Sequence, residues 1–251
     1  MTQPRVAAQL IIYGDRAQRD LPGVLAEVAT AGYAGVEGGT PANAEQIAEM
    51  RQALAVSNLA YAGGHCGLGQ LGDPSVVAAL ARGVSGLGGR FLLVSGRADS
   101  LDGYRAAAQT LDQAGRVCRE AGIALCYHNH NWEFHQIEGI RPIDLLVGET
   151  DPALVQLCPD VYWVHVGGDR PDDFIVRHRE RCPYFHFKDG LGGERYQEFR
   201  PLGEGRVDLK RALEAALSCE PEWVTVEQDH TDGEPADAIR ASRQYLKSLG
   251  L

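Results

Sequence analysis

Eight short apolar runs, separated by longer segments with helical patterns, are the feature that most restricts how this 251-residue chain can fold. The runs recur roughly every 25 to 40 residues, and each has a mostly continuous apolar body rather than strict alternation. Such bodies are typical of parallel strands that are buried on both faces. The expected strands are residues 7–14, 33–39, 59–65, 90–96, 123–130, 154–160, 184–189 and 223–229.

Helix-start signals occur between these runs. In "TPANAEQIAEMRQAL" we expect Thr40 to cap a helix and Pro41 to lie in its first turn. In "GDPSVVAALARGV" the pair Asp73 and Pro74 has the same arrangement, and in "VDLKRALEAAL" Asp208 is the expected cap. The chain therefore predicts an alternating order of strands and helices.

Alternation without a linker or a low-complexity stretch predicts one α/β domain over residues 1–251. Eight strand–helix units in a chain of this length are typical of a (β/α)8 TIM barrel. The main alternative is an open doubly wound sheet. That fold usually has a glycine-rich phosphate turn after its first strand, and "YGDRAQRD" is not such a turn.

The charge balance argues against several classes of partner. The chain has 24 Lys and Arg against 34 Asp and Glu, for a formal net charge of −10. Such a surface repels nucleic-acid backbones and anionic membranes, so we expect neither as a partner. The sequence shows no secretory signal pattern, and no apolar run approaches the roughly 20 residues of a membrane span. Six scattered cysteines without a CxxC pair favour a reducing cytoplasm.

Polar side chains gather where the expected strands end. They are Glu37, His65, His128 with His130, Asp160, His186 with Lys188 and Asp189, and Glu227 with Asp229. In a (β/α)8 barrel the carboxyl ends of all strands meet at one face, which holds the active site. Histidine and carboxylate ligands together suit Mn²⁺, Mg²⁺, Co²⁺ or Zn²⁺. The pattern therefore predicts one divalent metal site at this face.

Each residue also has a purely structural alternative. Asp160 precedes "VYWV" and is placed to cap a turn, while Lys188 and Asp189 could form a surface ion pair. Glu227 could be a solvated strand end, and Trp132 could serve packing alone. The joint placement of these residues at strand ends, rather than any one of them, supports a site.

Six blocks in this order resemble the sugar phosphate isomerase/epimerase superfamily, which has a xylose isomerase-like TIM barrel. The blocks are "GYAGVEGG", "YHNHNWEF", "PDVYWVHVGG", "YFHFKDG", "PLGEGRVDLKRAL" and "VTVEQD". The resemblance extends from about residue 7 to 245 and implies a metal held by Asp160, His186 and Glu227. Where many members have a glutamate after the fifth strand, this chain has His128, as in the "YHNH" branch. Either His128 is the fourth ligand or Glu133 replaces it.

A metal at this place would polarise a sugar carbonyl and stabilise an enediolate. Glu133 and Glu227 are the predicted acid/base pair, and Lys188 is a further catalytic candidate. Predicted substrate contacts are His65, His130, Trp132, Glu37 and Arg195. For Arg195, a grip on a substrate oxygen or phosphate competes with a solvated loop position.

These residues favour a metal-dependent isomerase or epimerase of a sugar, keto-sugar or related polyol, in carbohydrate metabolism. A lyase on the same scaffold, acting on a 2-keto-inositol or a keto-glycoside, shares the first step and is the alternative. His128 stands where many members have the first glutamate of the metal site, and this replacement favours the lyase over the epimerase. A repair nuclease would need more metal ligands and a basic face. A non-catalytic sugar-binding barrel is a third class, and a homo-oligomer is possible in any of these.

Overall fold

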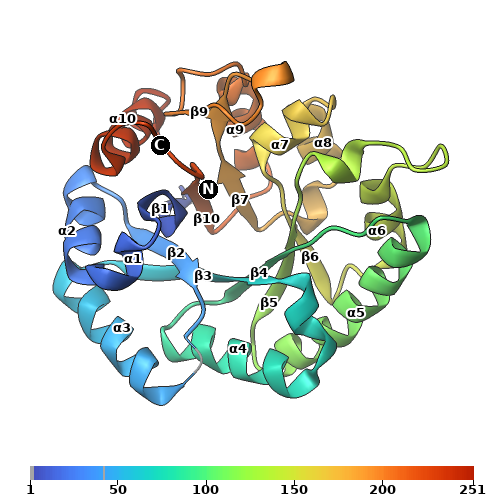
Figure 1. Cartoon of the computed structure of the whole chain (residues 1–251), viewed down its shortest axis with the longest axis horizontal. Coiled ribbons are helices and arrows are strands. Elements are labelled where there is room, and N and C mark those ends of the chain that lie inside the picture. Colours follow the sequence, from blue (N-terminus) through green and yellow to red (C-terminus); the bar gives the residue numbers. More distant parts are fainter. Residues whose placement is uncertain (1–2, 42) are drawn as a thin grey trace.

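A computed structural model describes residues 3–41 and 43–251 of the chain. Eight strands form one parallel sheet in the order β6-β5-β4-β3-β2-β1-β10-β7, which curls into a barrel (Figure 1). The strands are β1 (Arg5–Gln9), β2 (Gly35–Gly39), β3 (Ala60–Gly67), β4 (Phe91–Ser95), β5 (Ala124–His128), β6 (Val155–Cys158), β7 (Tyr184–Phe187) and β10 (Trp223–Val226). All eight overlap the runs that the sequence predicted as strands.

The barrel closes between its two end strands, β6 and β7. One parallel bridge joins Asp160 to His186, and the backbone amide of His186 donates to the Pro159 carbonyl at 3.0 Å. The ring of strands is therefore nearly complete. The (β/α)8 TIM barrel prediction is confirmed, and the open doubly wound sheet is excluded.

Helices surround the barrel as an outer ring (Figure 1). They are α1 (Arg16–Arg19), α2 (Leu21–Ala31), α3 (Ala44–Ser57), α4 (Pro74–Gly86), α5 (Leu101–Glu120), α6 (Pro142–Glu149), α7 (Val161–Val166), α8 (Pro171–Arg177), α9 (Leu209–Leu217) and α10 (Pro235–Ser248). Short 3₁₀ segments are η1 (Leu10–Tyr13), η2 (Leu68–Gly72), η3 (Trp132–Phe134), η4 (Arg179–Arg181) and η5 (Gly193–Arg195).

Two apolar clusters hold the layers together. The larger one fills the space between strands and helices. The smaller one fills the barrel interior and consists of Ala7, Ala62, Phe91, Leu93, Cys126, Cys158, Tyr184 and Trp223. The interior is thus a packed core, which leaves the strand ends as the place for a site.

Two of the three predicted helix starts are confirmed. Asp73 accepts from the amide of Ser75, and Asp208 accepts from the amide of Arg211. The prediction for Thr40 and Pro41 is wrong, because Asn43 is the cap of α3. Its extended backbone lets its side chain accept from the Gln46 amide at 2.9 Å.

The first predicted strand, residues 7–14, extends too far. Its second half, Leu10–Tyr13, is the 3₁₀ segment η1. Gln9 ends the strand because its side-chain oxygen accepts from the Ile11 amide at 2.6 Å, which turns the chain. As a result Ile11 points away from the core and is 47% exposed.

A loop after β7 accounts for much of the "KDG…PLGEGRVD" pattern. The short strands β8 (Asp189–Gly190) and β9 (Phe199–Arg200) pair antiparallel. The buried Asp189 carboxylate accepts from the amides of Gly190, Gly203, Gly205 and Val207. This part of the motif is therefore a structural anchor.

Two further observations concern the whole described chain. Its six cysteines are all free thiols. Among the described residues, no helix combines the length and apolarity needed to cross a membrane.

Candidate active site

Four side chains from different strand ends meet at the carboxyl face of the barrel. They are His128 at the end of β5, Asp160 at the start of α7, His186 in β7 and Glu227 just after β10. Each offers one ligand atom, and these atoms lie within 4.8 Å of one another. All four side chains are buried. This is the set that the sequence predicted as metal ligands, with His128 rather than Glu133 in the fourth place.

One polar atom of each of these four side chains has no hydrogen-bond partner in the described part of the chain. His128 Nδ1, Asp160 Oδ2, His186 Nδ1 and Glu227 Oε2 are buried and have no hydrogen bond among the described residues. His186 Nδ1 and Glu227 Oε2 lie only 2.5 Å apart, without hydrogen-bond geometry. Because an unsatisfied buried polar atom costs about 1–3 kcal/mol, such convergence needs a compensating group. Two imidazoles and two carboxylates fit a divalent cation.

Burial in the site shifts the pKa of each of these side chains. Burial would lower the pKa of His186, but Cys158, Glu37 and Glu227 outweigh it and raise this pKa well above its ordinary value, so a cation that binds here must displace a proton from His186. Burial and the neighbouring His186 lower the pKa of His128 well below its ordinary value, so its imidazole is neutral. Burial would raise the pKa of Glu227, but Lys188 and His186 hold it well below its ordinary value. Burial raises the pKa of Asp160, and the charge of Lys188 offsets this in part.

Asp160 serves two purposes with its two oxygens. Oδ1 accepts from the Trp163 amide at 2.9 Å and caps α7, as its structural alternative predicted, while Oδ2 points to the ligand group. Asn129 fixes the backbone on the other side, because its Oδ1 accepts from the Asp160 amide at 3.1 Å. Capping and ligation are therefore compatible in this residue.

Glu37 lies below His186 and is fully buried. Its Oε2 is 2.6 Å from His186 Nε2 and accepts from the Tyr184 hydroxyl at 2.8 Å. Burial would raise the pKa of Glu37, but the charge and hydrogen bond of His186 hold it below its ordinary value. The sequence predicted a substrate contact here. The structure instead gives Glu37 a position from which it orients a ligand side chain.

Lys188 is completely buried, so its interpretation as part of a surface ion pair is wrong. Its Nζ donates to Glu227 Oε1 at 2.9 Å and to Asp229 Oδ1 at 2.5 Å, and it lies over the Trp163 ring. Burial would lower the pKa of Lys188, but Glu227 and Asp229 outweigh it and raise the pKa. Lys188 therefore fixes two carboxylates beside the ligand group.

Histidines line the approach to this group. His65 contacts Glu37 through Nδ1 at 3.4 Å and Ser95 through Nε2 at 3.1 Å. His130 stacks on Trp132 with ring centroids 4.0 Å apart. Burial, aided by the charge of Lys188, lowers the pKa of His130 to about 3. Trp132 thus packs against a residue of the site.

Glu133 faces away from the ligand group. It is fully buried, with Oε1 accepting from the Tyr127 hydroxyl at 2.7 Å and Oε2 from the His130 amide at 2.8 Å. Both oxygens are occupied, so the alternative in which Glu133 replaces His128 as ligand does not fit. The acid/base pairing of Glu133 with Glu227 also finds no geometric support. Burial raises the pKa of Glu133 to about 7.

Arg195 lies outside the site. Its side chain is 62% exposed and forms an ion pair with Glu198 in the loop between β8 and β9. Of its two sequence interpretations, the structure supports the solvated loop position.

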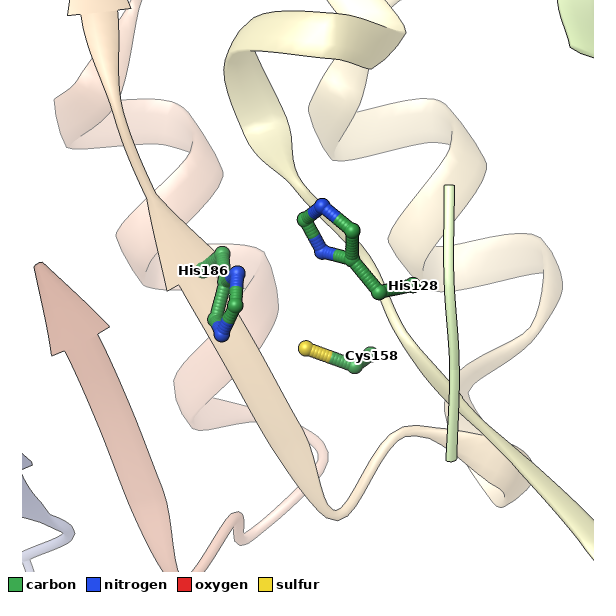
Figure 2. A group of neighbouring side chains, drawn as sticks. All are labelled: His128, Cys158 and His186. Carbon is green, nitrogen blue, oxygen red and sulfur yellow. The ribbon is translucent and has the colours of Figure 1, made fainter. Parts of the chain in front are cut away.

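Cys158 is an additional donor near the ligand group. Figure 2 shows the His128 and His186 rings beside each other, tilted by 54°, with the Cys158 sulfur directed towards the space between them. Burial raises the pKa of this thiol to about 11, and the side chain also packs in the barrel interior. The sequence indicated only its core role.

A cavity of about 790 Å³ opens from the ligand group. His65, Ser95, His128, His130, Glu227 and Asp229 line its inner end. Glu133 and Arg195 do not line it.

Three polar residues of the site, Asn129, Ser95 and Tyr184, were not singled out from the sequence. Only Asn129 carried a signal, as the middle residue of "HNH".

Comparisons with known proteins agree with this architecture. A family model described as xylose isomerase-like TIM barrel matches residues 25–249. An inosose dehydratase of Halalkalibacterium halodurans is 25% identical over 154 residues, which are 54% of this chain and 50% of that protein. The chain thus matches about half the length of this curated relative.

Two solved structures resemble the whole chain. A sugar phosphate isomerase/epimerase from Parabacteroides distasonis superposes with a TM-score of 0.84 at 20% identity, covering 98% of both chains. The 3-keto-D-glucoside 4-epimerase of E. coli superposes with a TM-score of 0.76 at 18% identity, covering 98% of this chain and 100% of that one. At these identities the likeness concerns the fold.

Proposed function

The chain belongs to the xylose isomerase-like TIM barrel family, and we propose that it is a metal-dependent enzyme that removes a proton beside the carbonyl of a sugar, keto-sugar or related polyol. The observation that carries this proposal is the convergence of four buried ligand atoms, none of which has a hydrogen bond among the described residues, at the barrel's carboxyl face. A divalent cation bound there would act as a Lewis acid on the substrate carbonyl.

The chain's own residues have distinct proposed roles. His128, Asp160, His186 and Glu227 hold the cation, and Glu37 orients His186. Asp229 lines the cavity and is held by Lys188, so we propose it as the base that takes the proton. His65 and His130 reach the same cavity and are placed to contact substrate hydroxyls. The buried inner end limits access of water.

The arrangement favours a lyase of the dehydratase type. An epimerase needs acid/base groups on both faces of the substrate, and here Glu133 is turned away while Glu227 and Asp229 come from one strand end. In dehydration the C–H bond beside the carbonyl breaks and its electron pair forms the enediolate. The C–O bond of the next hydroxyl then breaks, and that hydroxyl leaves as water with a proton from the enzyme. The inosose dehydratase relative adds support.

An isomerase or epimerase of a ketose is the second candidate, because it shares the enediolate and the same ligands. His65, which also lines the cavity, would then return the proton. The two epimerase-type structures with the same fold are compatible with it.

Metal content of the purified protein, measured by plasma mass spectrometry, tests the proposal first. We expect about one equivalent of Mn, Co, Zn or Mg, which Asp160→Asn and His186→Ala lose and Asp229→Asn retains. No metal after reconstitution would overturn the mechanism.

The reaction class is tested on the metal-loaded protein in D₂O. A 2-keto-inositol and a set of ketoses are incubated with the enzyme and followed by mass spectrometry. A lyase gives a product that has lost one water, whereas an epimerase gives an isomer that carries solvent deuterium. Asp229→Asn is expected to abolish either product while its metal content stays normal.

A further inference from the structure

The cavity at the candidate site has two chemically different ends. The inner end is polar and contains the histidines and carboxylates of the site. The outer end is lined by the apolar side chains Leu10, Ile11, Ala17, Leu21 and Met50, together with the polar residues Gln18, Gln46 and Glu49. A pocket whose two ends differ in this way matches a ligand with one polar and one apolar part.

The outer end is built from segments that follow β1 and β2. Leu10 and Ile11 lie in η1, Leu21 begins α2, and Met50 lies in α3. In TIM barrels the loops after the strands distinguish one substrate from another. These segments therefore occupy positions where substrate specificity is decided.

Ile11 is the most informative of these residues. Four large hydrophobic side chains are conspicuously exposed in the described chain, and they are Ile11, Val56, Ile140 and Val176. Of these four, Ile11 alone lines this cavity. The hydrogen bond from its amide to Gln9 fixes the turn that exposes it. A ligand group covering Ile11 would remove this apolar surface from water.

The cavity also lacks positive side chains. Its lining among the described residues includes Glu49, Glu227 and Asp229 but contains no lysine or arginine. Lys188 is close by, but Glu227, Asp229 and the Trp163 ring enclose it. Arg195 is held in another loop by Glu198. Away from the metal ligands, a phosphate group would meet the Glu49 carboxylate without a lysine or arginine to pair with.

We propose that the substrate is an uncharged sugar derivative bearing an alkyl or aryl group, such as a glycoside, and that phosphorylated sugars are excluded. The volume of about 790 Å³ lies within the range of pockets for drug-sized ligands and exceeds the need of a lone sugar ring. This inference rests on the proposed function for placing the sugar at the inner end. The apolar end is defined by its own residues.

Isothermal titration calorimetry with unreactive probes tests the inference. The probes are methyl β-D-glucopyranoside, 4-nitrophenyl β-D-glucopyranoside and glucose 6-phosphate, each with and without Mn²⁺. We expect the nitrophenyl glucoside to bind at least about tenfold tighter than the methyl glucoside. Glucose 6-phosphate should bind no tighter than the methyl glucoside.

Two substitutions test whether the tighter binding of the nitrophenyl glucoside comes from the outer end of the cavity. Ile11→Asp and Met50→Gln are expected to reduce the preference for the aryl glycoside to less than about threefold. Ile140→Asp is the matched control, since Ile140 is also an exposed loop isoleucine but does not line the cavity. It should keep the full preference. Thermal melting confirms that all three variants fold.

Three results would overturn the inference. The first is that the two glucosides bind with equal affinity, or that neither binds detectably. The second is that the preference for the aryl glucoside survives Ile11→Asp and Met50→Gln. The third is that glucose 6-phosphate binds more tightly than the methyl glucoside. The aryl preference is expected in metal-free protein too, because no ligand atom lies at the outer end. A protein that binds no metal but keeps the preference would therefore contradict the proposed function alone.

Discussion

Oε2 of Glu37 lies 2.6 Å from Nε2 of His186, although 149 positions separate the two residues in the sequence. A proton on Nε2 that is donated to this carboxylate leaves the lone pair of His186 on Nδ1. That nitrogen is the one that faces the other unpartnered atoms of the site. A carboxylate behind a ligating histidine fixes both its ring orientation and its tautomer. Glu37 thus acts on the site through His186.

Glu37→Gln should weaken metal binding without abolishing it. The amide can still accept a hydrogen bond from Nε2, but the negative charge that strengthens His186 as a ligand is lost. Substitutions of such supporting residues typically lower metal affinity by about 10–100-fold. Competition against a fluorescent chelator measures this change. Tyr184→Phe, which removes one hydrogen bond to Glu37, should have a smaller effect. Unchanged affinity in Glu37→Gln would show that barrel packing alone orients His186.

Lys188→Met should destabilise the metal-free protein. The substitution leaves the buried Glu227 and the partly exposed Asp229 without the lysine ammonium group that both contact. Breaking a buried ion pair in this way costs about 3–5 kcal/mol. Urea unfolding in the presence of a chelator measures the free energy of unfolding.

Lys210→Met is the control for this experiment, because Lys210 is exposed. We expect it to unfold like the wild type. Bound metal should restore part of the stability of Lys188→Met, since the cation then compensates the Glu227 charge. If Lys188→Met is as stable as Lys210→Met without metal, the buried ion pair contributes nothing to folding.

The strands were predictable because a buried parallel strand needs a continuous apolar run, and each of the eight runs overlaps a strand of the structure. The turn at residues 10–13 was not. "LIIY" is as apolar as a strand, and only the hydrogen bond from the Ile11 amide to Gln9 makes it a 3₁₀ segment. Ile11 was missed as a residue of the cavity for the same reason.

The ligand set was predictable from polar residues at strand ends, since closure of the barrel brings those ends together. The direction in which each carboxylate points could not be predicted from the sequence. Glu133 lies beyond the end of β5 and Glu37 lies within β2. Glu133 turns to Tyr127, whereas Glu37 turns to His186. Side-chain direction depends on strand register and loop conformation, which the sequence does not reveal.

Gly205→Ala should destabilise the loop between β8 and α9. A Cβ at this position would collide with the Asp189 carboxylate and with the backbone nitrogen of Gly190. The carboxylate could then no longer accept all of its amide hydrogen bonds from the loop. We expect a loss of about 1–3 kcal/mol in the free energy of unfolding. Gly72→Ala is the control, because a Cβ there has no neighbour within 4 Å. Equal stability of the two variants would show that the loop shifts freely.

Glu133→Gln should change how stability depends on pH. Burial raises the pKa of Glu133 from 4.5 to about 7 in the folded protein. Between these values the folded state holds a proton that the unfolded state has released. The free energy of unfolding therefore falls as pH rises through this window. Above about pH 7 the folded protein bears the full cost of holding an ionised carboxylate in a buried place. Because one pKa unit corresponds to about 1.4 kcal/mol, the cost is about 3 kcal/mol.

The neutral amide that Glu133→Gln introduces carries no such cost, so this variant should gain stability relative to the wild type between about pH 5 and pH 8. The neighbouring Tyr104 and Tyr127 stay neutral, because burial raises the pKa of both phenols. Glu138→Gln, in the same loop but exposed, should follow the wild-type curve. Urea unfolding at about pH 5, 6, 7 and 8 measures the difference. Parallel curves for Glu133→Gln and the wild type would mean that water reaches the carboxylate and that Glu133 is ionised throughout.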